Sequence, residues 1–494
     1  MTQPIALEQL EARIREVSLD LDAETMRRAG YRVVDYLVKR LTEIRGSKLG
    51  RELTREEAEA LLREPMPEEP SDFDAVFDEY ARNVAPNAIQ IDHPQFFAFI
   101  PSAPNFISML ADALAAGTNV FAGTWLESSG PSQVEILVID WFKEMLGLPA
   151  EAAGLLVSGG SVANLTALAV ARHALLRNET ADAVVYFSDQ THASVDRALW
   201  LLGIRASQLR RIPTRTDLAL DVTELRKRLV LDRKAGLHPF AVIANAGTTN
   251  TGAIDPMREI ASLAREQELW LHVDAAYGGF AALTERGRRL LDGIEQADSV
   301  VLDPHKWFYC PFEAGCAIVR RGRLMRETFH ILPEYMTDVA RAEREVNFCD
   351  YGVQLTRSFR ALKVWMAVKT FGAQRFREVI DQCLDLTEFA AELFRRSPRL
   401  EIVTPPSLGI FTFRYVPKRL RGTPSESESE LNRLNSDLVA RAIASGEIFL
   451  SSTRLGSRTV VRFCVLNHRT RKEDIRRALR QIERFGQEAE QARA

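Results

Sequence analysis

The sequence contains few cysteines, little net charge and no long apolar run. Its five cysteines are scattered without the close spacing of metal ligands, which favours free thiols over disulfides or a metal site. The 64 basic and 67 acidic residues give a formal charge of −3, which argues against nucleic-acid and anionic-membrane partners. No run of about 18 apolar residues could span a bilayer, and the N-terminus lacks a basic-then-apolar signal. We therefore expect a cytoplasmic protein without a membrane anchor.

The alternation of apolar and polar segments predicts an α/β fold. With 494 residues and 46% hydrophobic content, the chain has material for more than one domain. Residues 5–44 have amphipathic helical periodicity, and strands alternate with helices from about residue 96 to 369. That alternation predicts a mostly parallel sheet with helices on both faces. We expect three domains: an N-terminal helical segment (1–90), a large domain (91–370) and a small C-terminal α+β domain (371–494).

The small C-terminal domain is predicted from short apolar runs. These indicate strands at residues 401–403, 410–413 and 459–464, followed by a closing helix at 472–485. Between the strands, residues 424–430 alternate serine and glutamate after a proline. Such low complexity predicts an exposed acidic turn.

A lysine stands just after a run that has the character of a buried strand. The run Ser299–Leu302 is followed by Asp303-Pro304-His305-Lys306-Trp307. Burial penalises an ammonium group, so we expect a lowered pKa for Lys306. A neutral lysine amine can attack an aldehyde to form a Schiff base. On these residues alone, a loop lysine with its ammonium in water fits equally well.

An aspartate stands at the end of the preceding apolar strand. Residues 269–273 are followed by Asp274-Ala275-Ala276-Tyr277-Gly278, whose small residues allow a flat ligand to approach the backbone. Alone, such an acid is commonly a helix cap or a turn residue. In an open parallel sheet, however, Asp274 and Lys306 would both project into the crevice at the carboxyl ends of the strands.

A glycine turn supplies a third element of the same pattern. Residues 154–164 predict a short strand, a turn at Gly159-Gly160 and a helix that starts near Ser161, where free amides favour an anion. The three-glycine spacing of a dinucleotide site is missing. A lysine, a facing carboxylate and an anion cradle are what pyridoxal phosphate needs, because a carboxylate keeps the pyridine nitrogen protonated and the ring electron-accepting.

Taken together, the motifs resemble those of the group II pyridoxal-phosphate-dependent amino-acid decarboxylases, closest to the aromatic-L-amino-acid decarboxylases. The resemblance runs from the N-terminal helices to near the C-terminus and implies a fold-type I, transferase-like α/β fold. The motifs that carry it are His93-Pro94-Gln95-Phe96-Phe97-Ala98, residues 158–164, Ser188-Asp189-Gln190-Thr191-His192, Gly247-Thr248-Thr249, residues 272–277 and residues 303–307.

The resemblance implies roles for individual residues. Lys306 would bind the cofactor aldehyde, Asp274 would pair with the pyridine nitrogen, and His192 would stack on the ring. An ionised Asp303, where relatives often carry asparagine or serine, would repel the phosphate near which it would lie. His192 and Thr249 could also be ordinary loop residues, and His305 could be a structural neighbour of Lys306. The remaining cofactor contacts would be made by Gly160, Ser161, Thr249, Ala276 and His305.

The segment 332–352 has the polar composition of a mobile lid. The resemblance implies that Tyr335 protonates the substrate carbon after carbon dioxide leaves, whereas related aldehyde synthases carry phenylalanine there. Tyr335 therefore favours simple decarboxylation. A surface tyrosine in a disordered loop fits the local composition equally well.

The substrate is only partly defined by the same resemblance. Ser102, Phe121, Gly123 and Thr356 match positions near the substrate in relatives. The Thr356 hydroxyl favours a phenolic side chain, whereas Gly123 favours a larger one. No arginine is placed to pair an acidic side chain, which disfavours an acidic substrate.

These observations predict a pyridoxal-phosphate-dependent decarboxylase that converts an L-amino acid, expected to be aromatic, to its amine and carbon dioxide. The alternatives are an aldehyde synthase on the same scaffold and a cofactor-free interaction protein. Relatives complete each active site with a loop of a partner subunit. The resemblance therefore implies a homodimer in which Phe121 lies near the neighbouring cofactor.

Overall fold

The computed structural model describes residues 6–15, 17–331, 344–422 and 427–492. The chain divides into two compact units, Met1–Ile89 and Gln90–Ala494. Among the described residues, no helix is both long enough and apolar enough to cross a membrane.

The N-terminal unit is helical, and its first two helices are separated by a non-helical segment. It contains α1 (Leu7–Glu11), α2 (Ala23–Glu43), α3 (Arg55–Leu62) and α4 (Phe73–Glu79). The stretch 5–44, predicted to be largely helical, contains α1 and α2, and the described residues between them are not helical. There the Ser18 hydroxyl accepts the Asp20 N–H at 3.0 Å, and the Asp22 carboxylate caps α2. Such side-chain bonds satisfy the backbone outside a helix.

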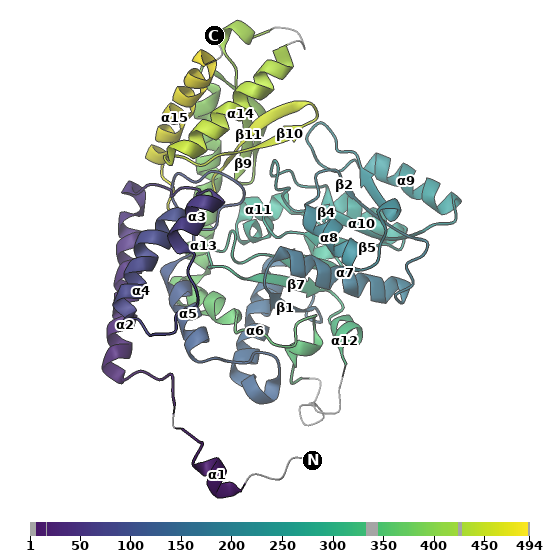
Figure 1. The fold of residues 1–494 in the computed structure, drawn as a ribbon. Helices are drawn as coiled ribbons and strands as arrows, with labels where there is room; N and C mark the ends of the chain where they lie inside the picture. Colours follow the sequence, from purple (N-terminus) through teal and green to yellow (C-terminus); the bar gives the residue numbers. More distant parts are fainter. Residues whose placement is uncertain (1–5, 16, 332–343, 423–426, 493–494) are drawn as a thin grey trace. The chain divides into compact units, whose positions relative to one another are not determined.

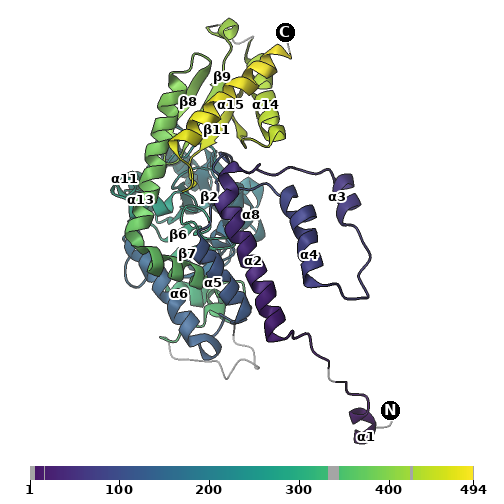
Figure 2. The ribbon, with the colours of Figure 1, turned by 90° about the vertical axis from the view of Figure 1, so that its left-hand side faces the viewer.

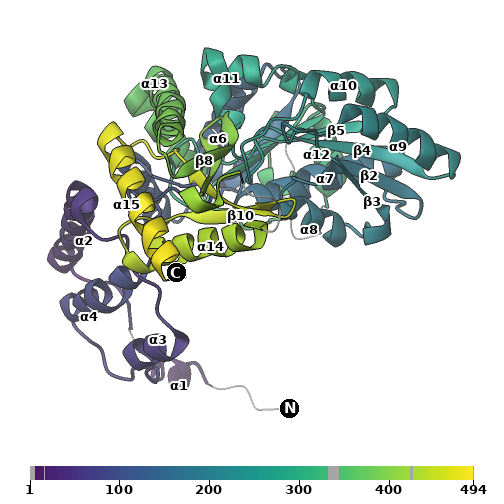
Figure 3. The same ribbon diagram turned by 90° about the horizontal axis from the view of Figure 1, so that it is seen from above.

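The larger unit contains a seven-stranded sheet that is mostly parallel, as predicted. Its order is β1-β7-β6-β5-β4-β2-β3, and β7 alone runs antiparallel to both of its neighbours. Figure 3 shows α10 on one side of this sheet and α7 and α8 on the other, so helices cover both faces. The strands are β1 (Ala153–Val157), β2 (Ala183–Ser188), β3 (Leu209–Ile212), β4 (His238–Asn245), β5 (Trp270–Asp274), β6 (Ser299–Leu302) and β7 (Gly315–Val319).

The helices of this α/β part follow the predicted alternation with the strands. Strands β2, β5, β6 and β7 are buried along their whole length, as a sheet covered on both faces requires. The helices are α5 (Phe106–Gly117), α6 (Trp125–Leu146), α7 (Gly160–Leu176), α8 (Ala193–Leu201), α9 (Val222–Lys234), α10 (Met257–Glu266), α11 (Glu285–Leu290) and α12 (Arg323–Phe329).

A four-stranded antiparallel sheet forms the C-terminal part (Figure 1). Its order is β10-β11-β9-β8, built from β8 (Leu400–Ser407), β9 (Ile410–Tyr415), β10 (Ser451–Leu455) and β11 (Arg458–Cys464). Helices α14 (Glu428–Ser445) and α15 (Lys472–Gln491) pack with it. The long helix α13 (Ala361–Arg395) runs from α5 and α6 to β8 (Figure 2) and is kinked at Gly372, where φ is 74°.

The predicted acidic turn at 424–430 is wrong in its last part, because α14 starts at Glu428. Two interactions explain the difference. Leu434 and Leu438 are buried in the core of the C-terminal part, and the Glu428 carboxylate lies 2.9 Å from the guanidinium of buried Arg414. The serine and glutamate residues at 425–430 gave no apolar periodicity, so the start of this helix could not be predicted from them.

Candidate functional site

A cavity of about 390 Å³ opens at the carboxyl ends of the parallel strands. Asn245 and Asp274 end β4 and β5, and Asp303 directly follows β6. This volume is within the range of small-molecule sites. The cavity is lined by Ser158, Gly159, Gly160, Ser161, Asn164, His192, Ser194, Asn245, Gly247, Thr248, Thr249, Asp274, Ala276, Tyr277, Asp303, His305 and Lys306.

Lys306 forms an ion pair with Asp303 in this cavity. Its Nζ lies 2.9 Å from Asp303 Oδ2, and 24% of the lysine side chain remains exposed. Burial disfavours the ammonium, but the Asp303 carboxylate outweighs it, with a further contribution from Asp274, and raises the pKa of Lys306. The expected lowering of this pKa is therefore wrong for the protein alone. Burial alone would lower this pKa, but the acid three positions earlier reverses the direction of the shift.

Asp274 is held in place by a buried asparagine. The Asn164 side chain donates to Asp274 Oδ2 at 3.1 Å, and its Oδ1 is 2.8 Å from His272 Nε2. His272 Nδ1 is in turn 2.8 Å from the Ser299 hydroxyl. Burial lowers the pKa of His272 to about 4, so the ring is neutral at neutral pH. This chain of bonds fixes the carboxylate that faces the cavity.

His192 caps helix α8 with its ring. Ser194 N–H donates to His192 Nδ1 at 3.2 Å, which makes Nδ1 an acceptor and leaves Nε2 to carry the proton. Burial lowers the pKa of His192, although Asp274 and Asp303 oppose the effect. The cavity therefore contains a neutral imidazole at neutral pH.

The start of α7 forms an anion cradle beside Asp303. Within the described part of the chain, no side chain caps α7, so its first amides remain available to a ligand. A Cβ atom on Gly160 would lie 2.9 Å from Asp303 Oδ2 and 3.3 Å from the Ala276 methyl. Gly160 therefore permits a close approach of Asp303 and Ala276 to the cradle.

His305 and Ser102 are joined through the loop that carries Lys306. The Ser102 hydroxyl donates to the His305 carbonyl, and Ala314 N–H donates to His305 Nδ1 at 3.1 Å. Burial lowers the pKa of His305, and its Nε2 lies 3.6 Å from Asp303 Oδ2. Ser102 thus holds the loop by a hydrogen bond and is not part of the cavity lining among the described residues.

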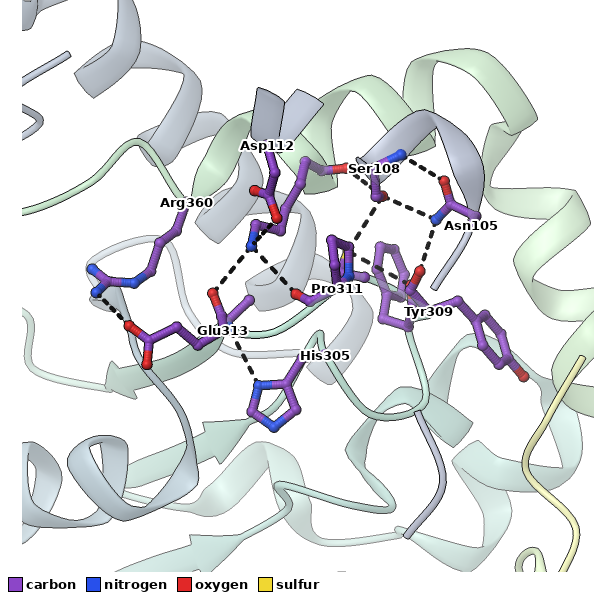
Figure 4. Close-up of polar contacts among 12 residues, drawn as sticks. Asn105, Ser108, Asp112, His305, Tyr309, Pro311, Glu313 and Arg360 are labelled. Carbon is purple, nitrogen blue, oxygen red and sulfur yellow. Dashed lines mark hydrogen bonds and ion pairs between the residues drawn. The ribbon is translucent and has the colours of Figure 1, made fainter. Parts of the chain in front are cut away.

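The same loop is anchored by a second lysine, whose partners Asp112, Pro311 and Glu313 are labelled in Figure 4. Lys363 on α13 is 4% exposed, and its Nζ lies 2.9 Å from Asp112 Oδ2 on α5. It also donates to the carbonyls of Pro311 and Glu313, at 3.3 and 3.2 Å. Three donors meet three acceptors, so the buried ammonium is fully satisfied.

Phe121, Gly123 and Thr356 do not line the cavity formed by the described residues. A Cβ atom on Gly123 would collide with the Phe121 ring and lie 2.9 Å from the Leu355 carbonyl. The volume of a larger residue at Gly123 is therefore filled by Phe121. This arrangement weakens the expectation that Gly123 enlarges a substrate pocket.

Thr249 lines the cavity, and its carbonyl is held by the C-terminal sheet. Arg462 of β11 donates to that carbonyl, to the Phe99 carbonyl at 3.0 Å and to the Asn250 carbonyl at 3.0 Å. Tyr335, the expected proton donor, lies outside the described residues.

Sequence reasoning missed the polar residues that orient the others. Asn164, Ser194 and Asn245 line the cavity and were given no role. The position of Asn164 could have predicted its role. It lies one turn after the start of the helix that follows the glycine turn, so its side chain is on the same helix face as that start. Asn245 ends an apolar strand just as Asp274 does, and this shared position could also have predicted its role.

The cavity fits pyridoxal phosphate in size and chemistry. It presents an amine for an aldehyde, a fixed carboxylate for a pyridine nitrogen and an uncapped helix start for a phosphate. His192 and Ala276 line the space between these groups.

Comparisons with known proteins agree with this arrangement. The model of the family described as the pyridoxal-dependent decarboxylase conserved domain matches residues 56–416. The chain is 42% identical over 472 residues to an aromatic-L-amino-acid decarboxylase of Bacillus atrophaeus, covering 95% of this chain and 97% of the relative. It is 30% identical to phenylacetaldehyde synthase of Arabidopsis thaliana, covering 94% and 96%. The crystal structure of Oryza sativa TDC with PLP and tryptamine matches with a TM-score of 0.90 and 29% identity, covering 96% of this chain and 99% of that one.

Proposed function

This chain belongs to the pyridoxal-phosphate-dependent decarboxylase family, and we propose that it converts aromatic L-amino acids to their amines and carbon dioxide. The observation that carries the aromatic assignment is the 42% identity, over nearly the whole of both chains, to an aromatic-L-amino-acid decarboxylase. The cavity residues support the chemistry, because the lysine and the facing carboxylate lie in one crevice.

The cavity residues expected to contact the cofactor ring have separate proposed roles. Bound pyridoxal phosphate supplies a protonated ring that accepts the electron pair left when carbon dioxide departs. Lys306 provides the amine that holds the aldehyde and yields to the substrate amine. Asp274, oriented by Asn164, holds the proton on the pyridine nitrogen. Neutral His192 stacks on the ring and donates its Nε2 proton toward the substrate carboxylate.

The phosphate end is assigned to Gly160, Ser161 and the neighbouring side chains. Amides at the start of α7 hold the phosphate, while Ala276 packs against the ring. Thr249 and His305 line the cavity, and we assign them contacts that would hold the ring's phenolic oxygen side and the rest of the cofactor, respectively. Tyr335 is proposed to return a proton to the substrate carbon.

The substrate side chain is proposed to contact Ser102, Phe121, Gly123 and Thr356. Phe121 packs against Gly123, which supports an apolar wall for an aromatic ring. Because Phe121 does not line the cavity formed by the described residues, the proposal includes a second subunit, with Phe121 near its cofactor.

A homodimer is supported by exposed apolar side chains along α2. Met26, Tyr31, Val33, Val34 and Val38 are all exposed, and exposed apolar patches mark association surfaces. The five cysteines are free and buried in the described structure, which supports a cytoplasmic location. Light scattering on the active protein should report a dimer, and an active monomer at assay concentration would contradict this part of the proposal.

The second candidate is an aldehyde synthase, favoured by the 30% identity to phenylacetaldehyde synthase. Such an enzyme releases aldehyde, ammonia and peroxide instead of amine. The test is a screen of L-amino acids with purified, cofactor-loaded protein, measuring amine, carbon dioxide and peroxide together. We expect amine and carbon dioxide in equal amounts from an aromatic amino acid. Peroxide in place of amine would establish the aldehyde synthase.

A further inference from the structure

Asp303 occupies the same cradle that the cofactor phosphate requires. Its side chain is 2% exposed, and its Oδ2 lies 2.9 Å from where a Cβ atom of Gly160 would stand. Gly160 is the first residue of α7, whose start has no side-chain cap within the described residues. A phosphate bound to these amides would therefore lie beside a carboxylate.

The carboxylate has one charged partner. Lys306 Nζ is 2.9 Å from Asp303 Oδ2, whereas His305 Nε2 is 3.6 Å away and belongs to a ring whose pKa burial lowers. Asp303 Oδ1 is buried and has no hydrogen-bond partner among the described residues. The acid thus has one unsatisfied oxygen and a single lysine to balance its charge.

The other titratable groups near Asp303 add no positive charge. His192 on α8 is neutral because burial lowers its pKa, and Cys316 on β7 is a neutral thiol because burial raises its pKa. Asp274 on β5 contributes a second negative charge to the same cavity. Of the described groups that face Asp303, Lys306 alone is therefore cationic at neutral pH.

We propose that the phosphate enters this cradle together with one proton, which the Asp303 carboxylate takes up from solvent. Two anions that share one buried site cannot both remain ionised without a large electrostatic cost. The protonated carboxyl removes the repulsion and offers an O–H that donates to a phosphate oxygen. Cofactor binding is then proton-linked at a residue that does no chemistry on the substrate. This inference rests on the proposed function only for the identity of the cofactor.

Calorimetry of cofactor binding tests the proposal directly. Cofactor-stripped protein is titrated with pyridoxal phosphate in two buffers of different ionisation enthalpy, which gives the number of protons taken up. The wild type should take up about one proton more than Asp303→Asn, because the amide is already neutral. Its affinity for pyridoxal phosphate should also fall about tenfold more per pH unit above neutrality than that of the variant. At pH 8.5 Asp303→Asn should bind pyridoxal phosphate more tightly than the wild type.

Pyridoxal, which lacks the phosphate, is the matched ligand. With it, the excess of wild type over Asp303→Asn should be about one proton smaller than with pyridoxal phosphate, because the loss of the Lys306–Asp303 ion pair is common to both ligands. Asp112→Asn is the matched protein control, because Asp112 also lies 2.9 Å from a buried lysine, Lys363, but away from the cavity lining. It should keep the wild-type proton count, and thermal unfolding establishes that each variant is folded.

Three results would overturn the proposal. The first is an equal proton count for wild type and Asp303→Asn with pyridoxal phosphate. The second is a proton excess of wild type over Asp303→Asn that is as large with pyridoxal as with pyridoxal phosphate. The third is weaker binding of pyridoxal phosphate by Asp303→Asn than by wild type at pH 8.5. No amino acid is present in these titrations. A chain that shows the proton linkage but releases no amine would therefore refute the proposed activity and leave this inference intact.

Discussion

Lys363 on α13 and Asp112 on α5 form an ion pair, 2.9 Å long, that also holds the loop carrying Lys306. The ammonium donates to the carbonyls of Pro311 and Glu313 as well. Residue Ala314, which follows, donates its N–H to the ring of His305. One lysine outside the cavity thereby sets the position of a residue within it.

Replacing Lys363 with methionine should destabilise the protein by about 3 kcal/mol, at the lower end of the range for breaking a buried pair. The lower end applies because the Asp112 side chain is 34% exposed, so water can partly solvate its carboxylate once the lysine is gone. Urea unfolding measures the loss. Lys369→Met, at an exposed position of the same helix, is the control and should change stability little. Equal stability of the two variants would contradict the anchoring role.

Replacing Lys306 with alanine should abolish both turnover and the visible absorbance of lysine-bound cofactor. Among the described residues, Lys306 is the lysine that lines the cavity and can bind the aldehyde. Absorbance spectra and an amine assay check this, with Lys369→Ala as the control. A variant that retains wild-type turnover with bound cofactor would remove Lys306 from the proposed role.

The buried ring of His272 should make stability fall in acid. Its pKa is lowered to about 4 by burial, whereas an unfolded histidine titrates near 6.5. Between these values the unfolded chain binds a proton that the folded chain does not, so stability is complete above about 6.5 and is lost as the pH falls toward 4. The full loss is about 3 kcal/mol.

Denaturant unfolding at several pH values between 4 and 8 tests this expectation for His272. His272→Gln should flatten the acid limb relative to wild type. His238→Gln, at an exposed position, serves as the control and should retain the slope. An unchanged slope in His272→Gln would assign the acid sensitivity to other groups.

Removing only the hydroxyl of Tyr335 should redirect the products. If the phenol returns the proton to the substrate carbon, Tyr335→Phe should lose amine formation by roughly 10²–10⁴-fold, the range of a general acid, with little loss of substrate affinity. Oxygen would then divert product toward aldehyde, ammonia and peroxide. Parallel assays of amine and peroxide measure the partition. Unchanged amine production would defeat the role of Tyr335.

The parallel strands and the residues at their ends could be predicted from the sequence, because buried strands are continuous apolar runs. Ser299–Leu302 forms β6 as predicted, and the run before Asp274 forms β5. Strand β7 was not predicted to be antiparallel, since its apolar run carries no mark of direction. The connection 303–314 between β6 and β7 contains no crossover helix, which a parallel pair of strands would need.

The candidate site could be predicted by position but not by its electrostatics. The motif placed Lys306 and Asp303 together, yet the direction of the lysine pKa shift depends on a 2.9 Å contact that a sequence does not specify. The packing of Phe121 against Gly123 could not be predicted for a similar reason. A glycine in the sequence does not indicate which neighbouring side chain occupies the space beside it.

The three carbonyls held by Arg462 limit how this protein can be re-engineered. Strand β11 contributes the guanidinium, whereas Phe99, Thr249 and Asn250 belong to segments far away along the chain. In a chimera that takes its C-terminal sheet from a relative, the relative would therefore supply the donor that holds the Thr249 carbonyl at the cavity wall. Such an exchange should preserve the cavity only if the donor sheet carries an arginine at the same register. Truncation before β11 would leave three partly buried carbonyls without their donor.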